Sequence, residues 1–100
     1  MTPHIARTAG KLVNRRRRLE QKVSNDREMI ESETARRALG EAWCAERYWN
    51  TLLRRHEPLL AAVNAELLGL LASADAEDLT ALLEHKSAEV RLVAIASVAG

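Results

Sequence analysis

The chain has 100 residues and a formal net charge of +1, and 47% of its residues are apolar while 29% are charged. This length allows one small domain, since domains usually need about 50 to 250 residues each, and the apolar content excludes a disordered chain. No segment reaches the roughly 18 apolar residues of a membrane span, and no secretory-type apolar run precedes the first charges. The single cysteine, Cys44, excludes an internal disulfide bond and fits a reducing compartment. We therefore expect one domain over residues 1–100, no membrane association and a cytoplasmic location.

The near-neutral total hides a strong asymmetry of charge along the chain. Residues 1–27 have a net charge of +6, residues 28–57 of −1 and residues 58–100 of −4. A basic first quarter predicts an anionic partner. The alternative is that the basic and acidic ends attract each other, within one domain or between two protomers.

The residue types favour helices throughout. The chain has no Phe, one Tyr and two Trp, whereas Ala, Leu, Arg and Glu, which suit helices better than strands, dominate. We predict an all-α protein, a compact bundle of four to five helices.

The first predicted helix is basic and covers residues 3–23. Thr2 can cap it, with Pro3 at its first position, where a missing N–H costs nothing. Residues 24–26, a Ser-Asn-Asp segment, interrupt its apolar spacing, so we expect the helix to end there.

The second predicted helix is long and covers residues 26–56. Asn25 followed by Glu28 resembles a capping box at its start. Gly40 either ends this helix or lies inside it, and we expect it to lie inside because one helical stripe continues across it. The stripe comprises Ala35, Ala38, Ala42, Ala45, Trp49, Leu52 and His56.

Three shorter helices are predicted in the C-terminal half, over residues 58–72, 76–85 and 88–99. Pro58 fits the first turn of a helix and not the interior of the preceding one. The next start is marked by Ser73 or Asp75 and the last one by Ser87, since these residue types cap helices.

The last two predicted helices resemble a single helix pair of the HEAT repeat family. The matching positions are Leu79, Leu82, Leu83, Val90, Arg91, Ala94 and Val98. In that family such pairs stack into a solenoid that binds proteins or nucleic acids. The remaining residues show no second copy, so the resemblance implies a HEAT-like packing of the C-terminal hairpin and no function.

The final helix is apolar on nearly every side. Only Glu89 and Arg91 are strongly polar within it. Such a helix needs cover on most sides, either from an earlier helix of the chain, which we expect, or from a second chain.

Basic residues form a stripe along the first predicted helix. Four consecutive arginines circle the helix, so no side of that turn can be buried without enclosing a charge, and Arg16 has to extend past the apolar face. The stripe is about 22 Å long, which suits the phosphates of a nucleic acid or an acidic groove on a protein. The residues predicted to bind an anionic partner are Arg7, Lys11, Arg15, Arg16, Arg17, Arg18 and Lys22.

The same helix could instead form a coiled-coil dimer. Apolar residues nearly follow a 3.5-residue period from Ile5 to Ile30. Arg16 and Asp26 lie on this seam and argue against a long coiled coil.

A second candidate surface centres on Trp43. All three aromatic residues lie between residues 43 and 49, and Trp49 falls on the apolar stripe, whereas Trp43 falls among arginines. Trp and Arg are enriched at interface hot spots. The predicted protein interface is Trp43 with Arg36, Arg47 and Arg54; the alternative is that Trp43 fills a second packed side of its helix.

We find no pattern typical of an enzyme, a cofactor site or a metal site. His4, Cys44, His56 and His85 are far apart, and structural roles at helix ends are expected for the histidines. The leading hypothesis is therefore a non-enzymatic adapter whose basic helix binds nucleic acid or a nucleic-acid-handling protein complex. Alternatives are a small phage or mobile-element inhibitor (anti-CRISPR-like) that occludes a host nucleoprotein complex, and a self-associating structural protein.

Overall fold

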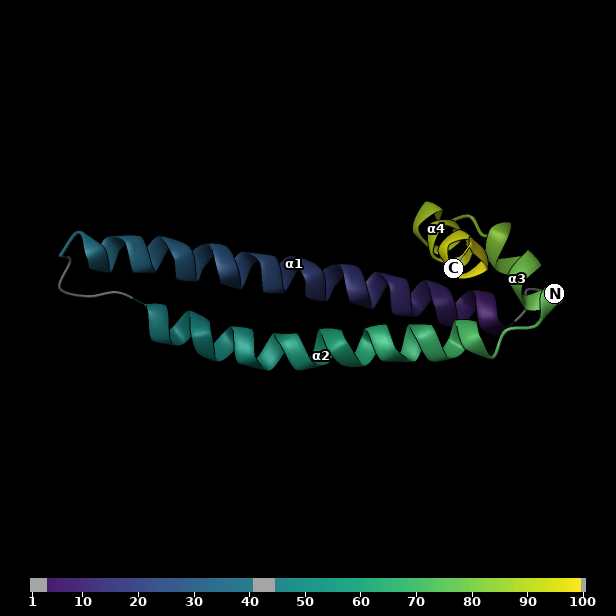
Figure 1. Cartoon of the computed structure of the whole chain (residues 1–100), viewed down its shortest axis with the longest axis horizontal. Coiled ribbons are helices and arrows are strands. Elements are labelled where there is room, and N and C mark those ends of the chain that lie inside the picture. Colours follow the sequence, from purple (N-terminus) through teal and green to yellow (C-terminus); the bar gives the residue numbers. More distant parts are fainter. Residues whose placement is uncertain (1–3, 41–44, 100) are drawn as a thin grey trace. The chain divides into compact units, whose positions relative to one another are not determined.

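The computed structural model describes residues 4–40 and 45–99 and places four helices in them (Figure 1). No strand occurs in these ranges, so the predicted all-α class is confirmed. The bundle of four to five helices and the HEAT-like packing stay predictions. The helices are α1 (His4–Ala38), α2 (Glu46–Ala72), α3 (Ala76–Leu83) and α4 (Ala88–Ala99).

The chain divides into two compact units. Unit 1 comprises Met1–Arg16 and Ala62–Gly100, and unit 2 comprises Arg17–Ala61. Both α1 and α2 contribute a segment to each unit. The single domain over residues 1–100 stays a prediction.

Unit 1 is held together by one apolar core to which all four helices contribute. Ala94 is fully buried, and Val13 and Leu82 are 1% exposed. Their burial removes apolar surface from water, which is the main favourable term in folding. The core residues are Ile5, Ala9, Leu12 and Val13 of α1, Leu67 and Leu71 of α2, Leu82 of α3, and Val90 and Ala94 of α4.

The two short helices of unit 1 begin where their capping residues predict. The Asp75 carboxylate accepts a bond from the Asp78 N–H at 2.8 Å, and the Asp75 N–H donates to the Asp78 carboxylate at 3.3 Å. This reciprocal pair is a capping box. The Ser87 hydroxyl accepts from the Val90 N–H at 3.4 Å at the start of α4. The predicted ranges 76–85 and 88–99 thus agree with α3 and α4 to within two residues.

Unit 2 contains antiparallel segments of α1 and α2, which run side by side in Figure 1. Asp26 contacts His56. Glu33 lies further along α1, and its partner Ala45 comes before His56 in the chain. This reversed order of partners is the pattern of an antiparallel helix pair. Asp26, which lies on the coiled-coil seam of α1, therefore makes its contact within the chain.

The predicted helix break at residues 24–26 is wrong. α1 continues through this segment to Ala38, and Asp26 is buried with 2% of its surface exposed. Asp26 does not cap a new helix, because its carboxylate faces His56 of α2. A contact distant in sequence has overridden the local preference of Ser, Asn and Asp for helix ends.

The predicted continuity of the helix across Gly40 is also wrong. Gly40 has a φ of +83°, a left-handed conformation that favours glycine, and α1 ends at Ala38. The range 26–56 therefore belongs to two different helices, α1 and α2.

The helix start predicted at Pro58 is wrong as well. Pro58 lies inside α2, and its side chain is exposed. Proline removes one helical N–H, which would have bonded to the Arg54 carbonyl. Since Pro58 faces solvent, water can reach that carbonyl, and α2 runs on to Ala72.

Candidate functional site

The basic stripe of α1 is exposed in unit 1. Arg7, Lys11 and Arg15 all present their side chains to solvent. None of the three makes a hydrogen bond or ion pair with any residue that the structure describes. Their charges are therefore not neutralised within the described part of unit 1.

The stripe is equally exposed in unit 2. Arg18 and Lys22 are open to solvent, and within residues 4–40 and 45–99 neither has a hydrogen-bonding or ionic partner. We refer to Arg7, Lys11, Arg15, Arg18 and Lys22 together as the basic face of α1.

Arg16 and Arg17 differ from the five residues of the basic face. Both make polar contacts inside the chain. Arg16 is half-buried and lines a groove with apolar side chains, in keeping with its place on the apolar seam, while Arg17 is exposed. The sequence analysis predicted one surface of seven cations. In the structure, Arg16 and Arg17 have polar partners, whereas the five residues of the basic face have none among the described residues.

The groove beside Arg16 lies entirely within unit 1 and has a volume of about 670 Å³. Its walls come from α2 and α4, and most of its lining is apolar. The residues that line it with Arg16 are Asn64, Leu67, Leu68, Leu71, Ala72, Val93, Ala96 and Ser97.

α4 is covered on one side only. Val90 and Ala94 face the core, whereas Leu92 is 64% exposed, Ile95 51% and Val98 62%. The expectation that other helices cover this helix holds for its inner side. No described residue buries the outer apolar face of α4, which we define as Leu92, Ile95 and Val98.

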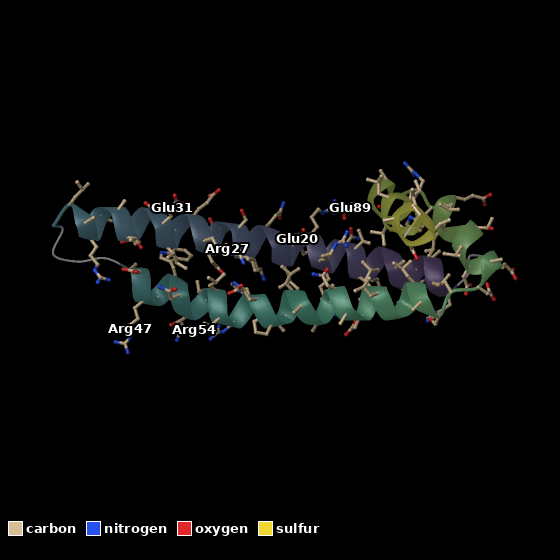
Figure 2. The ribbon with its side chains drawn as sticks, in the orientation of Figure 1. Glu20, Arg27, Glu31, Arg47, Arg54 and Glu89 are labelled. Atoms are coloured by element: carbon tan, nitrogen blue, oxygen red, sulfur yellow. The ribbon has the colours of Figure 1, made fainter. Side chains whose placement is uncertain are left out.

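A second, polar pocket lies in unit 2 and has a volume of about 590 Å³. Figure 2 shows Arg47 and Arg54 projecting from the side of α2 that faces away from α1. The lining residues are Arg37, Glu46, Arg47, Asn50, Thr51 and Arg54.

The predicted interface around Trp43 stays a prediction, and the structure brings only some of its arginines together. Arg47 and Arg54 share the pocket, but Arg36 is half-buried and donates to Glu33 at 3.1 Å. Trp43 lies outside the described residues. Arg37 takes the place predicted for Arg36, a difference of one residue at the end of α1 that helical angles alone did not reveal.

Unit 2 also holds two buried carboxylates that the sequence did not single out as a pair. Asp26 Oδ2 lies 2.6 Å from His56 Nδ1, and Glu33 accepts a bond of 2.9 Å from the Ala45 N–H. Asp26 and Glu33 are 2% and 4% exposed. Their spacing of seven residues on the heptad seam was the available signal, since it puts both on the face toward α2.

The remaining histidines lie in unit 1 near helix ends. His85 follows α3, and its Nδ1 accepts from the Ser87 N–H at 2.9 Å, a contact that shapes the turn into α4. His4 opens α1 and lies 3.3 Å from the Thr8 hydroxyl. Cys44 lies outside the described residues.

The described residues show neither a metal site nor a membrane-spanning helix. No three His, Cys, Asp or Glu side chains among them are placed to hold a metal ion together. Of the described helices, none combines the length and apolar character needed to cross a bilayer.

Comparison of the chain with known proteins supplies no relative. Models of protein families, curated proteins and solved structures all give no match.

Proposed function

We propose that this chain is a non-enzymatic adapter that binds an anionic partner through the basic face of α1. The partner is a nucleic acid or a nucleic-acid-handling protein complex. One observation carries the proposal: the five cations of the basic face are exposed and have no counter-charge among the described residues.

Two acidic side chains of α2 are engaged by cations that lie outside the basic face. Glu57 pairs with Arg27 at 3.1 Å, and Glu46 pairs with Arg37 at 2.9 Å. Cations four residues apart on a helix repel each other by a few tenths of a kcal/mol per pair. A polyanion relieves this repulsion and releases the counterions that it had condensed. Contacts of this kind read the charge of a backbone and not its sequence.

Binding to a fluorescently labelled DNA duplex, measured by anisotropy over a series of salt concentrations, tests the proposal. If all five cations meet phosphates, log K against log salt has a slope of about −4.5. The variant Lys11→Gln/Arg15→Gln should bring the slope to about −2.7, because two phosphate contacts are lost.

The matched control is Arg55→Gln/Lys86→Gln. It also removes two exposed cations that have no described partner, but neither lies on α1. This control should keep the original slope. An affinity independent of salt, or an equal effect of both double variants, contradicts binding of nucleic acid through the basic face. A partner complex that survives nuclease in a pull-down then points to the protein alternative.

A second candidate function, self-association, is favoured by the outer apolar face of α4. Exposed apolar patches mark interaction sites when they are contiguous, and Leu92, Ile95 and Val98 follow one another at three-residue steps. Gel filtration with light scattering tests this candidate. A dimer that becomes a monomer in Leu92→Ser/Ile95→Ser supports it, and a monomer at high concentration excludes it. The inhibitor hypothesis stays a prediction from size and charge.

A further inference from the structure

The polar pocket of unit 2 carries two guanidinium groups that nothing in the described chain neutralises. Arg47 and Arg54 lie seven residues apart on α2, which puts them on one face of the helix. Neither side chain makes a hydrogen bond or ion pair with a described residue, yet both line the same pocket.

The one acidic residue of the pocket is already engaged. Arg37 Nη1 donates to Glu46 Oε2 at 2.9 Å. Three arginines and one glutamate therefore leave the lining with a net charge of +2. This matches the charge of a phosphate monoester, about −1.5 to −2 at neutral pH.

The remaining polar groups of the pocket are turned toward the backbone. The Asn50 amide donates to the Glu46 carbonyl at 3.0 Å, and the Thr51 hydroxyl donates to the Arg47 carbonyl at 2.9 Å. The N–H of Ala45, at the start of α2, donates to Glu33. The donors open to a ligand are thus the guanidinium forks, whose geometry suits phosphate oxygens.

An exposed aromatic ring lies one helical turn from a lining residue of the pocket, although it is not itself part of the lining. Tyr48 follows Arg47 and precedes Thr51 by three residues, so it is the helical neighbour of a lining residue. Its ring meets Trp49 edge-on, with centroids 5.1 Å apart and planes at 75°, and the residue stays 59% exposed. An oriented, exposed ring beside a phosphate site offers a nucleobase a surface on which to stack.

We propose that Arg47, Arg54 and Tyr48 form a nucleotide-binding site in unit 2, with a terminal phosphate on the two arginines and the base on the tyrosine. Arg37 contributes positive charge and holds Glu46 away from the ligand. The aromatic ring favours a nucleotide over a phosphorylated peptide. The site is independent of the basic face of α1, so either can fail without the other.

Titration of the full chain with adenosine monophosphate, adenosine and inorganic phosphate at low ionic strength tests the site, because these probes are too small to span the basic face of α1. NMR chemical shifts or calorimetry report the affinity. The monophosphate should bind at least about tenfold more tightly than adenosine, since two charge-assisted contacts depend on the phosphate. It should also bind more tightly than inorganic phosphate.

Two variants test the phosphate contacts and the base contact separately. Arg47→Gln/Arg54→Gln should abolish the preference for the monophosphate over adenosine. Tyr48→Ala should weaken monophosphate binding at least about fivefold and leave binding of inorganic phosphate unchanged. The matched control is Arg55→Gln, which removes an exposed cation of α2 outside the pocket and should change neither affinity.

Two results overturn the proposal. The phosphate site is eliminated if the wild type binds the monophosphate and adenosine with equal affinity. It is also eliminated if Arg47→Gln/Arg54→Gln binds the monophosphate as tightly as the wild type. If phosphoserine binds as tightly as the monophosphate and Tyr48→Ala changes neither, the nucleotide assignment is wrong. Lys11→Gln/Arg15→Gln should leave the affinities for these small probes unchanged, which keeps this test apart from that of the basic face.

Discussion

A buried charge on α1 depends on one histidine of α2. Asp26 is 2% exposed, and His56, at 2.6 Å, is 15% exposed in its side chain. An ionised carboxylate only accepts hydrogen bonds, so this contact is a hydrogen bond to such a carboxylate when His56 carries a proton on Nδ1. Removal of one partner leaves the other buried without compensation, which is the costly outcome for a buried pair.

We predict that His56→Leu lowers the free energy of unfolding by about 3–5 kcal/mol, and that adding Asp26→Leu recovers most of this loss. Urea unfolding followed by circular dichroism measures both values. The exposed pair Arg27–Glu57, with side chains 63% and 47% exposed, is the control, and Glu57→Gln there should cost at most about 1 kcal/mol. A His56→Leu loss no larger than that of the control would contradict a structural role for the pair.

Two glycines should respond in opposite directions to alanine. Gly40 has a φ of +83°, so Gly40→Ala should cost about 1–2 kcal/mol, the penalty of a left-handed L-residue. Gly69 lies inside α2, and a Cβ added there meets no atom within 4 Å. Gly69→Ala should therefore stabilise the chain by about 0.5–1 kcal/mol. Thermal unfolding of the two variants gives the signs, and equal signs would contradict the end of α1 at this position.

The helices show which local signals predict structure and which do not. The sequence offered Ser73 or Asp75 for the start of α3 and Ser87 for that of α4, and the caps at Asp75 and Ser87 form within three residues. Residues 24–26 are Ser, Asn and Asp, which favour helix ends equally well. The Asp26 side chain nevertheless contacts His56, thirty residues later in the chain. A capping signal is reliable only where no distant partner competes for the side chain.

The candidate surfaces follow the same division. Helical spacing alone predicted that Arg7, Lys11 and Arg15 share a face, and this needs no tertiary knowledge. Helical spacing did not predict which cations already form ion pairs, because their partners are distant in sequence. Arg37 pairs with Glu46, nine residues later, and Arg27 pairs with Glu57, thirty residues later. Nor did the sequence predict the uncovered side of α4, since burial depends on which helices pack against it.

At the scale of one element, Pro58 destabilises α2. A proline inside a helix costs about 3 kcal/mol relative to alanine in a peptide, through a lost hydrogen bond and a clash with the preceding turn. Pro58→Ala restores the N–H that bonds to the Arg54 carbonyl and should raise the free energy of unfolding by about 1–3 kcal/mol. Chemical denaturation measures the change. Leu59→Ala, at a neighbouring position that is 51% exposed, should change stability by less than about 0.5 kcal/mol.

No gain in Pro58→Ala would mean that the proline fits its position without strain. α2 would then be bent at this residue, as helices often are at proline. A measured gain instead indicates that the packing of α2 in unit 2 compensates for the lost hydrogen bond.

In the part of the chain that the structure describes, a small core is combined with many exposed charges, and the five cations of the basic face have no partner there. A chain of this size buries only about 60–65% of its unfolded surface, so its stability is modest and sensitive to ligands. Like charges on the basic face of α1 reduce that stability further. A partner that binds only the folded chain raises its apparent stability by mass action.

We therefore predict that a DNA duplex raises the melting temperature of the chain at low salt. At a duplex concentration one hundred times Kd, the gain is about 2.7 kcal/mol, which corresponds to roughly 13 °C for a domain of this size. Differential scanning fluorimetry measures the shift. High salt should abolish it, because the phosphate contacts are screened, and Lys11→Gln/Arg15→Gln should reduce it while Arg55→Gln/Lys86→Gln keeps it. A shift of equal size in the two double variants would mean that the duplex stabilises the chain through its general charge and not through the basic face of α1.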